Sequence, residues 1–367
     1  MLWLVVPIIY CAFFSFLPIR NNYTRLLVLS SAIFISVVIA GTRYNSDPDY
    51  YSYRQIYQLV PGLSSFFSYN LSSIHGEWGY LFLNSVFKTL DFGFFSLLFF
   101  FSLLSILLKV MAYNKMVSQD AVLAFLIYLS FNFINSEFIQ FRFGFAVGIL
   151  CFSFHYLYEK RTFQSFVLMI IAAFFHVFSL IFIIPMVIWR CYDKVRLFRY
   201  SSLYYTAVIV YIAVPLLQIN FLFGFLESYF PSFSLLSRLY NYSNSEMYGG
   251  EVNLFSFFAL RHIVFATIFY FMMRNNDDSK FEFYYVMYLV GMVFGFLTAG
   301  FEILSFRTFK LFDVVEPVLI CLALYRLSPG GRFALRIMLI LLCVTIYLLS
   351  VGKAGVDDYQ SWLGFYL

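Results

Sequence analysis

The sequence predicts an all-α fold, a polytopic integral membrane helix bundle with about ten full spans and one short helical hairpin. Only 12% of its 367 residues are charged, whereas a soluble domain carries about 25%. The mean hydropathy is +0.82. Apolar runs such as 92–112 and 333–351 have the ~20 residues that a helix needs to cross a bilayer core.

The apolar runs also place each span along the chain. The first run lacks the basic start and the small-residue cleavage site of a secretory signal, so we expect it to be retained. We expect one domain over residues 1–367. The predicted spans are 2–19, 26–41, 92–112, 120–135, 138–158, 201–221, 254–273, 281–300, 309–326 and 333–351.

Short basic loops predict the orientation, because lysine and arginine accumulate on the cytoplasmic side. The loops expected there are 20–25, 109–115, 159–161, 274–280 and 325–332. The opposite, outer face then carries two longer loops, at about 41–91 and 220–253.

Residues 162–189 do not fit a single crossing, because basic clusters flank the segment on both sides. We predict two short helices that form a hairpin, with the break near "FFHVFS" and His176 at its tip. With this hairpin the bundle has 10–12 transmembrane segments. Non-helical backbone at membrane depth needs protein or a wet cavity around it, so the hairpin is expected to line a cavity.

Several function classes are excluded by missing motifs. Five scattered cysteines form no CxxC pair, and no HExxH or similar spacing occurs, so we expect no metal and no disulfide framework. A Walker loop, a GxGxxG turn and a GxSxG elbow are also absent, which argues against ATP-driven transport, serine hydrolysis and a bound cofactor. The net charge of +5 comes from short clusters between spans, so no nucleic-acid partner is expected.

Charged residues inside an apolar helix are the strongest functional signal, because burying a charge in hydrocarbon is costly. Arg142 is expected about 7 Å below Glu137 at 1.5 Å per residue. It is interpreted either as part of an ion pair with an acid such as Glu137 or as a ligand-binding group. Arg238 and Arg307 are expected near the outer face, where converging guanidinium groups suit a phosphate or pyrophosphate. Pairing with local glutamates is the alternative for these two.

His176 is interpreted either as a hydrogen-bonded core residue or as a group that takes part in chemistry. The pair Arg261 and His262 gives a weaker signal. Asp47 and Asp49 in "DPD" could hold a divalent ion, but two acids alone are thin support for a metal site.

The charged and aromatic clusters follow one another in a recognisable order. They read "RYNSDPDYYSYRQIY", "EWGYLFLN", "FIQFRFGFAVGILCFSFHYLYEKR", "FFHVFSLIFIIP" and "SFRTFKLFDVVEPVLI". From about residue 41 to 319 the chain resembles the EpsG family and the related Wzy-type O-antigen and capsule repeat-unit polymerases. The resemblance implies a GT-C-like polymerase bundle in the bacterial inner membrane, with its active site facing the periplasm.

The resemblance also implies a reaction and its partners. A glycan would move from undecaprenyl pyrophosphate onto a second lipid-linked repeat unit, so the partners are an undecaprenyl-pyrophosphate-linked donor and acceptor, membrane lipid and a chain-length regulator protein. Such a transfer needs positive charge at the departing pyrophosphate and a base at the acceptor hydroxyl. The pyrophosphate candidates are Arg142 and Arg307, supported by Arg43 and Arg238. The base candidates are Asp47, Asp49, Glu77 and His176. The candidates for sugar stacking are Tyr50, Tyr51, Tyr53 and Trp78.

Two other function classes stay open. A transporter or flippase of lipid-linked sugars would share the arginines and the cavity, but no inverted repeat is evident. Another GT-C-type lipid-sugar glycosyltransferase would carry an acidic pair in its first outer loop, where "DPD" lies. A membrane acyltransferase is not favoured, because the stronger histidine or arginine motif expected in its early helices is absent from the sequence.

Overall fold

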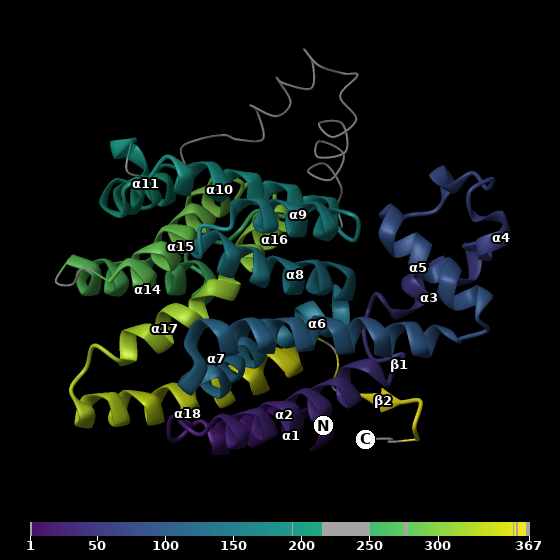
Figure 1. Ribbon diagram of the computed structural model, residues 1–367, viewed down its shortest axis with the longest axis horizontal. Helices are drawn as coiled ribbons and strands as arrows, with labels where there is room; N and C mark the ends of the chain where they lie inside the picture. Colours follow the sequence, from purple (N-terminus) through teal and green to yellow (C-terminus); the bar gives the residue numbers. More distant parts are fainter. Residues whose placement is uncertain are drawn as a thin grey trace, which may run out of the picture. The chain divides into compact units, whose positions relative to one another are not determined.

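The computed structural model describes residues 2–192, 194–214, 250–274, 278–354, 356 and 359–364. Helices dominate this part of the chain (Figure 1), and its one strand pairing joins β1 (Arg43–Tyr44) to β2 (Gln360–Ser361). Six described helices are long and apolar enough to cross a membrane: Asn22–Gly41, Phe94–Ile139, Phe141–Tyr158, Phe257–Arg274, Ser279–Leu297 and Pro329–Lys353. The prediction of a helical membrane protein is confirmed, whereas the ten spans and the GT-C-like arrangement stay predictions.

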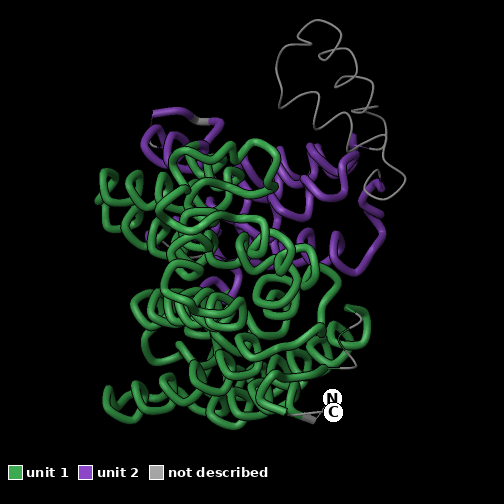
Figure 2. The backbone as a smooth tube through the Cα atoms, turned by 90° about the vertical axis from the view of Figure 1, so that its right-hand side faces the viewer, with its two compact units in different colours: residues 1–183, 320–367 green, residues 184–319 purple. Residues whose placement is uncertain are grey.

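The chain divides into two compact units, coloured separately in Figure 2. Unit 1 comprises residues 1–183 and 320–367, and unit 2 comprises residues 184–319. Each boundary falls within a helix. The boundary at 183/184 lies in α10 (Ile183–Arg190), and the boundary at 319/320 lies in α17 (Glu316–Leu324). Each unit is described by itself below, and the expected single domain stays a prediction.

Unit 1 is built around α6 (Phe94–Val117), which packs between α2 (Asn22–Gly41) and α8 (Phe141–Tyr158) (Figure 1). The helices are apolar on most faces, as expected for segments that bury one side in protein and expose another to lipid. The remaining helices of unit 1 are α1 (Leu2–Phe14), α3 (Tyr50–Leu59), α4 (Leu63–Phe66), η1 (Leu71–Ser73), α5 (Trp78–Thr89), η2 (Ser118–Asp120), α7 (Ala121–Tyr128), η3 (Leu129–Ile139), α9 (Thr162–Ala173), η4 (Val177–Phe182) and α18 (Pro329–Lys353).

Unit 2 is centred on α15 (Ser279–Leu297), which packs against α11 (Tyr200–Ala213), α14 (Phe257–Arg274) and α16 (Glu302–Phe312). The contact between α15 and α16 is close because glycines face phenylalanine rings. A Cβ atom at Gly291 would lie 2.3 Å from the Cβ of Phe312. Small residues allow helices to approach in this way in membranes. The unit also contains η5 (Arg196–Phe198) and η6 (Asp313–Val315).

The predicted interruption at His176 is present. Helix α9 ends at Ala173 and the 3₁₀ helix η4 begins at Val177, so the backbone leaves the α-helical conformation at "FFH". His176 is extended, with φ −156° and ψ 110°, and α9 packs against η4. The position of this break relative to a membrane stays a prediction.

The predicted cytoplasmic loop at 109–115 is wrong. These residues belong to α6, and Lys109 is fully buried. Its Nζ lies 2.7 Å from Oε1 of Glu137, and it donates to the Ser105 hydroxyl and the Gly144 carbonyl at 2.6 and 2.7 Å. A lysine can be buried when its charge is neutralised and its N–H groups are bonded, so this one is not a loop marker.

The predicted span at 120–135 changes from an α-helix to an irregular helix, and a break at Gln140 separates it from the next helix. The α-helix α7 ends at Tyr128, and the chain continues to Ile139 as the π-helix η3. Gln140, with φ −111° and ψ 50°, breaks the helical path before α8 begins at Phe141. Long π-helical stretches are uncommon and occur often at functional sites.

Candidate functional site

The break at Gln140 places Arg142 on the first turn of α8. This turn lies against the end of η3 so closely that a Cβ atom at Gly144 would be 1.9 Å from the Ser136 carbonyl oxygen. Glycine is therefore required there. Lys109 bonds to the side chain of Glu137, which precedes Arg142, and to the backbone carbonyl of Gly144, which follows it, so it links the segments on both sides of the arginine.

Arg142 lies in a setting of one acid and two aromatic rings. Its Nη1 donates to Oε2 of Glu77 at 2.9 Å. Its Cζ is 4.9 Å from the ring centroid of Tyr80 and 5.3 Å from that of Tyr53. A planar guanidinium interacts favourably with aromatic faces, and burial strengthens the interaction. The suggested partner Glu137 is instead bonded to Lys109.

The two tyrosines beside Arg142 are uncharged. Burial raises the pKa of the Tyr53 and Tyr80 phenols, and the nearby guanidinium of Arg142 opposes this shift only in part. Both rings therefore contribute aromatic faces and hydroxyl groups, and not negative charge.

The tip of the interrupted segment lies against the same acid. The backbone N–H of Val177 donates to Oε1 of Glu77 at 3.4 Å, so Glu77 contacts both Arg142 and the tip. The ring of His176 packs edge-on against Phe143, with 4.9 Å between ring centroids. The structure thus brings together Glu77, Arg142, Tyr53 and the segment that carries His176.

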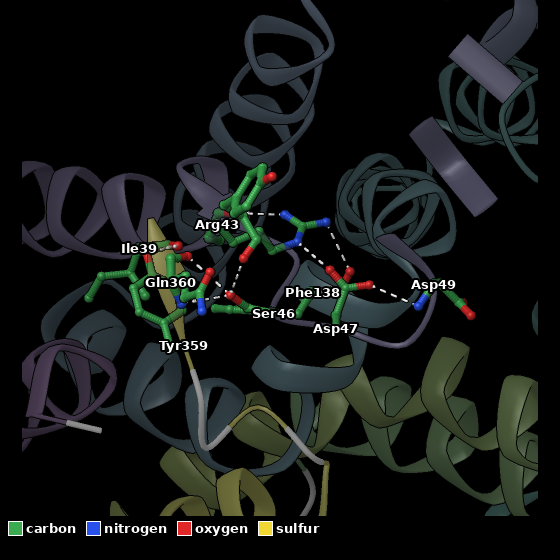
Figure 3. Close-up of polar contacts among 10 residues, drawn as sticks. Ile39, Arg43, Ser46, Asp47, Asp49, Phe138, Tyr359 and Gln360 are labelled. Atoms are coloured by element: carbon green, nitrogen blue, oxygen red, sulfur yellow. Dashed lines mark hydrogen bonds and ion pairs between the residues drawn. The ribbon is translucent and has the colours of Figure 1, made fainter. Parts of the chain in front are cut away.

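Arg43 and Asp47 form a second cluster (Figure 3). The Nε of Arg43 donates to Oδ2 of Asp47 at 2.9 Å, while Nη1 and Nη2 donate to the carbonyls of Ala40 and Phe138 at 2.5 and 2.9 Å. Arg43 is 1% exposed. Burial raises the pKa of the Asp47 carboxyl above its ordinary value, and Arg43 opposes that shift. The arrangement ties the end of α2 to the end of η3.

The strand pairing closes this second cluster. The hydroxyl of Ser46 donates to the carbonyls of Tyr44 and Gln360, and the backbone N–H of Gln360 donates to that hydroxyl at 2.8 Å (Figure 3). The hydroxyl of Tyr359 donates to the Ile39 carbonyl at 2.8 Å. The C-terminal strand therefore holds the loop that follows α2.

One phenylalanine joins the two clusters. The Cζ of Arg43 is 5.5 Å from the Phe141 ring centroid, and the Phe141 and Tyr53 rings are 4.2 Å apart. Arg142 lies over the same Tyr53 ring. The Arg43–Asp47 and Arg142–Glu77 pairs therefore belong to one contiguous region of unit 1.

The four predicted sugar-stacking residues differ in exposure. Tyr50 is buried and packs edge-on against Phe94, and Tyr53 is buried beside Arg142. Tyr51 is 58% exposed and Trp78 is 47% exposed. Only Tyr51 and Trp78 present a ring to the surroundings of unit 1 without a rearrangement.

Asp49 lies beside the second cluster, at the start of α3, where its backbone N–H donates to Oδ1 of Asp47 at 3.1 Å (Figure 3). The two remaining arginine candidates are not brought to this region by the described structure. Arg307 belongs to α16 of unit 2, so its convergence with Arg142 stays a prediction. Arg238 lies outside the described residues.

Unit 2 contains a buried charged cluster that sequence reasoning undervalued. Nη2 of Arg261 lies 3.0 Å from Oδ2 of Asp313 and 3.4 Å from Oε2 of Glu316. Nε2 of His262 lies 2.8 Å from Oδ1 of Asp313, and its Nδ1 lies 2.8 Å from the Phe258 carbonyl. All four charged or titratable side chains are buried. The sequence signal for this cluster was the pair "RH" within one apolar run and the stretch "DVVE" beside another.

Arg261 lies close to both carboxylates of this cluster. Both nitrogens of His262 lie 2.8 Å from an oxygen atom, one of the Phe258 carbonyl and one of the Asp313 carboxylate. The ligand atoms of His262, Asp313 and Glu316 lie within 4.8 Å of one another and could hold a metal ion, but Arg261 already supplies positive charge there. The expected absence of a metal stays a prediction.

Comparison with known proteins adds one finding. No curated protein and no solved structure matches the chain. The model of the EpsG family matches residues 26–365, which is nearly the whole sequence and includes both charged clusters of unit 1 and the cluster of unit 2. The chain therefore belongs to the EpsG family.

Proposed function

We propose that this protein is a glycosyltransferase that joins undecaprenyl-pyrophosphate-linked oligosaccharide repeat units into an O-antigen, capsule or exopolysaccharide. Membership in the EpsG family supports a polysaccharide polymerase-like membrane protein. The observation that carries the chemistry is Arg142, held by Glu77 and two tyrosines at the start of an apolar helix. The proposed location is the inner membrane, with the site facing the periplasm.

Arg142 is the proposed contact for the departing pyrophosphate. The carboxylate of Glu77 and the rings of Tyr53 and Tyr80 fix the guanidinium, and its Nε–H makes no hydrogen bond to a described residue. A fixed, partly desolvated donor stabilises developing negative charge without reorganising during the reaction. Arg307 and Arg238 are further contacts in the proposal. Arg43 supports the site, because its donors already bind Asp47 and two carbonyls.

In the proposed reaction, the acceptor hydroxyl oxygen forms a bond to the anomeric carbon of the donor. The bond from that carbon to the pyrophosphate oxygen breaks, the pyrophosphate leaves with the electron pair, and the hydroxyl proton passes to a base. Asp47 and Glu77 each form an ion pair with an arginine. The base is proposed to be one of the four candidates Asp47, Asp49, Glu77 and His176. Trp78 and Tyr51 are the preferred sugar-stacking rings, since both are exposed.

The experiment compares cell-surface polysaccharide in a host that lacks the gene. We expect wild type to restore a ladder of polymer lengths and Arg142→Ala to leave single repeat units at equal protein level. Arg20→Ala removes an exposed arginine and is the matched control, with a wild-type ladder expected.

Two results would contradict the proposal. A full ladder in the host without the gene would place polymerisation elsewhere. Loss of even single repeats in that host would instead favour a transporter of lipid-linked sugars, because single repeats reach the surface only after the lipid-linked unit has crossed the membrane.

A further inference from the structure

Three residues of the stretch "EWGY", residues 77–80, each make a different contact. Glu77 binds Arg142, Tyr80 lies over the guanidinium of Arg142, and Gly79 contacts the tip of the interrupted segment. The tip is defined here as residues 174–177, from the end of α9 to the first residue of η4. Residues at the start of α5 therefore contact both Arg142 and the tip.

The contact at Gly79 is a close backbone approach. Its N–H donates to the Phe174 carbonyl at 2.8 Å, and a Cβ atom at Gly79 would lie 2.8 Å from that oxygen and 2.9 Å from the Phe174 Cβ. Gly79 is in the first turn of α5, where backbone N–H groups lack partners within their own helix. The tip satisfies one of these donors, and no larger residue fits at position 79 without displacing it.

The contact at Glu77 links this docking to the arginine. One carboxylate oxygen accepts from the Val177 N–H at 3.4 Å, and the other accepts from Nη1 of Arg142 at 2.9 Å. Trp78 reinforces the contact, since its ring lies edge-on to Phe174 with 6.1 Å between centroids. If the tip moves away from α5, Glu77 loses its hydrogen bond from Val177. The carboxylate that holds Arg142 is then less firmly positioned.

We infer that the docking of residues 174–177 on the first turn of α5 sets the orientation of Arg142, with Glu77 as a positioning residue and Gly79 as the seat of the tip. The role assigned to Arg142 rests on the proposed function. In this arrangement Glu77 transfers no proton. The tip also brings His176 to the same region whenever Arg142 is correctly oriented.

Docking is tested without any activity measurement, by hydrogen–deuterium exchange on the full-length protein in detergent. When the tip is docked, the backbone N–H groups of Gly79 and Val177 both donate hydrogen bonds across the contact. We expect Gly79→Ala and Glu77→Gln to speed exchange in peptides covering 74–82 and 172–180 by roughly tenfold or more. Gly352→Ala is the matched control, because nothing lies within 4 Å of a Cβ there. Unchanged exchange in Gly79→Ala would overturn the docking.

Positioning is tested by polymerisation of a lipid-linked repeat unit by the same variants over a range of pH. We expect both variants to lose rate, on the order of 10²-fold for a group displaced by about 1 Å. The acidic limb of the pH–rate profile should persist in Glu77→Gln, whereas loss of that limb would identify Glu77 as the base and overturn the inference. Faster exchange with unchanged polymerisation would also overturn it. If wild type makes no polymer, the proposed function fails and the exchange comparison alone decides the docking.

Discussion

Lys109 and Glu137 form an ion pair of 2.7 Å in which neither side chain is exposed. The carboxylate also accepts from the hydroxyls of Ser105 and Tyr128, at 3.2 and 2.5 Å. Removing either partner of such a pair is strongly destabilising, because it leaves the other charge buried without a counter-charge.

The first prediction concerns this pair. Lys109→Met should lower the free energy of unfolding by about 3–5 kcal/mol, because it leaves the Glu137 charge buried without a cation. The double variant Lys109→Met/Glu137→Gln should recover part of that loss. Thermal unfolding in detergent measures both, and a single variant as stable as wild type would show that the pair contributes nothing.

The second prediction separates charge from shape at Arg142. Arg142→Lys keeps a positive charge but loses the planar group that lies over the Tyr53 and Tyr80 rings. We expect polymerisation to fall by on the order of 10²-fold, as when one oriented donor is lost. The measurement is polymer formed per unit time, with Arg20→Lys as control. Full activity in Arg142→Lys would mean that charge alone is sufficient.

The third prediction concerns Gly144. A Cβ atom there would lie 1.9 Å from the Ser136 carbonyl oxygen, so Gly144→Ala must displace the start of α8 or the end of η3. We expect a loss of stability of about 1–3 kcal/mol, the range for overpacked interiors. Gly330→Ala, where nothing lies within 4 Å of a Cβ, should leave the melting temperature unchanged. Equal melting temperatures for the two variants would refute this account.

The fourth prediction concerns metal dependence. Arg261 already lies within ion-pair distance of both Asp313 and Glu316, so we expect chelation by EDTA to leave polymerisation and the melting temperature unchanged. The control is the same protein dialysed without chelator. Activity that is lost with EDTA and restored by Mn²⁺ would assign a metal to His262, Asp313 and Glu316, and the variant Glu316→Gln would then abolish the restoration.

Sequence reasoning located the long helices well where apolar runs are continuous. The runs at 26–41 and 333–351 correspond to α2 and α18, and the charged flanks of 162–189 predicted the break at His176. The prediction at Lys109 was wrong. A lysine near the end of an apolar run shows the same local sequence pattern whether it lies in a loop or forms a buried ion pair.

The candidate residues were identified more readily than their contacts. Arg142 stands out in the sequence, but its partner Glu77 is 65 positions away. Arg261 and Asp313 are 52 positions apart. Such pairings depend on how helices pack, and a single sequence carries no local pattern for them. The role of Gly79 was also invisible, since it depends on a carbonyl that the tip supplies from nearly 100 residues later.

The pairing of β1 with β2 has a consequence for synthesis of the protein. Arg43 lies opposite Ser361 in this ladder, so one wall of the region around Arg43 and Asp47 is completed by residues translated more than 300 positions later. During translation, the loop after α2 emerges long before its partner strand exists. The pairing can therefore form only after β2 has been synthesised, which makes completion of this region a late event in biogenesis.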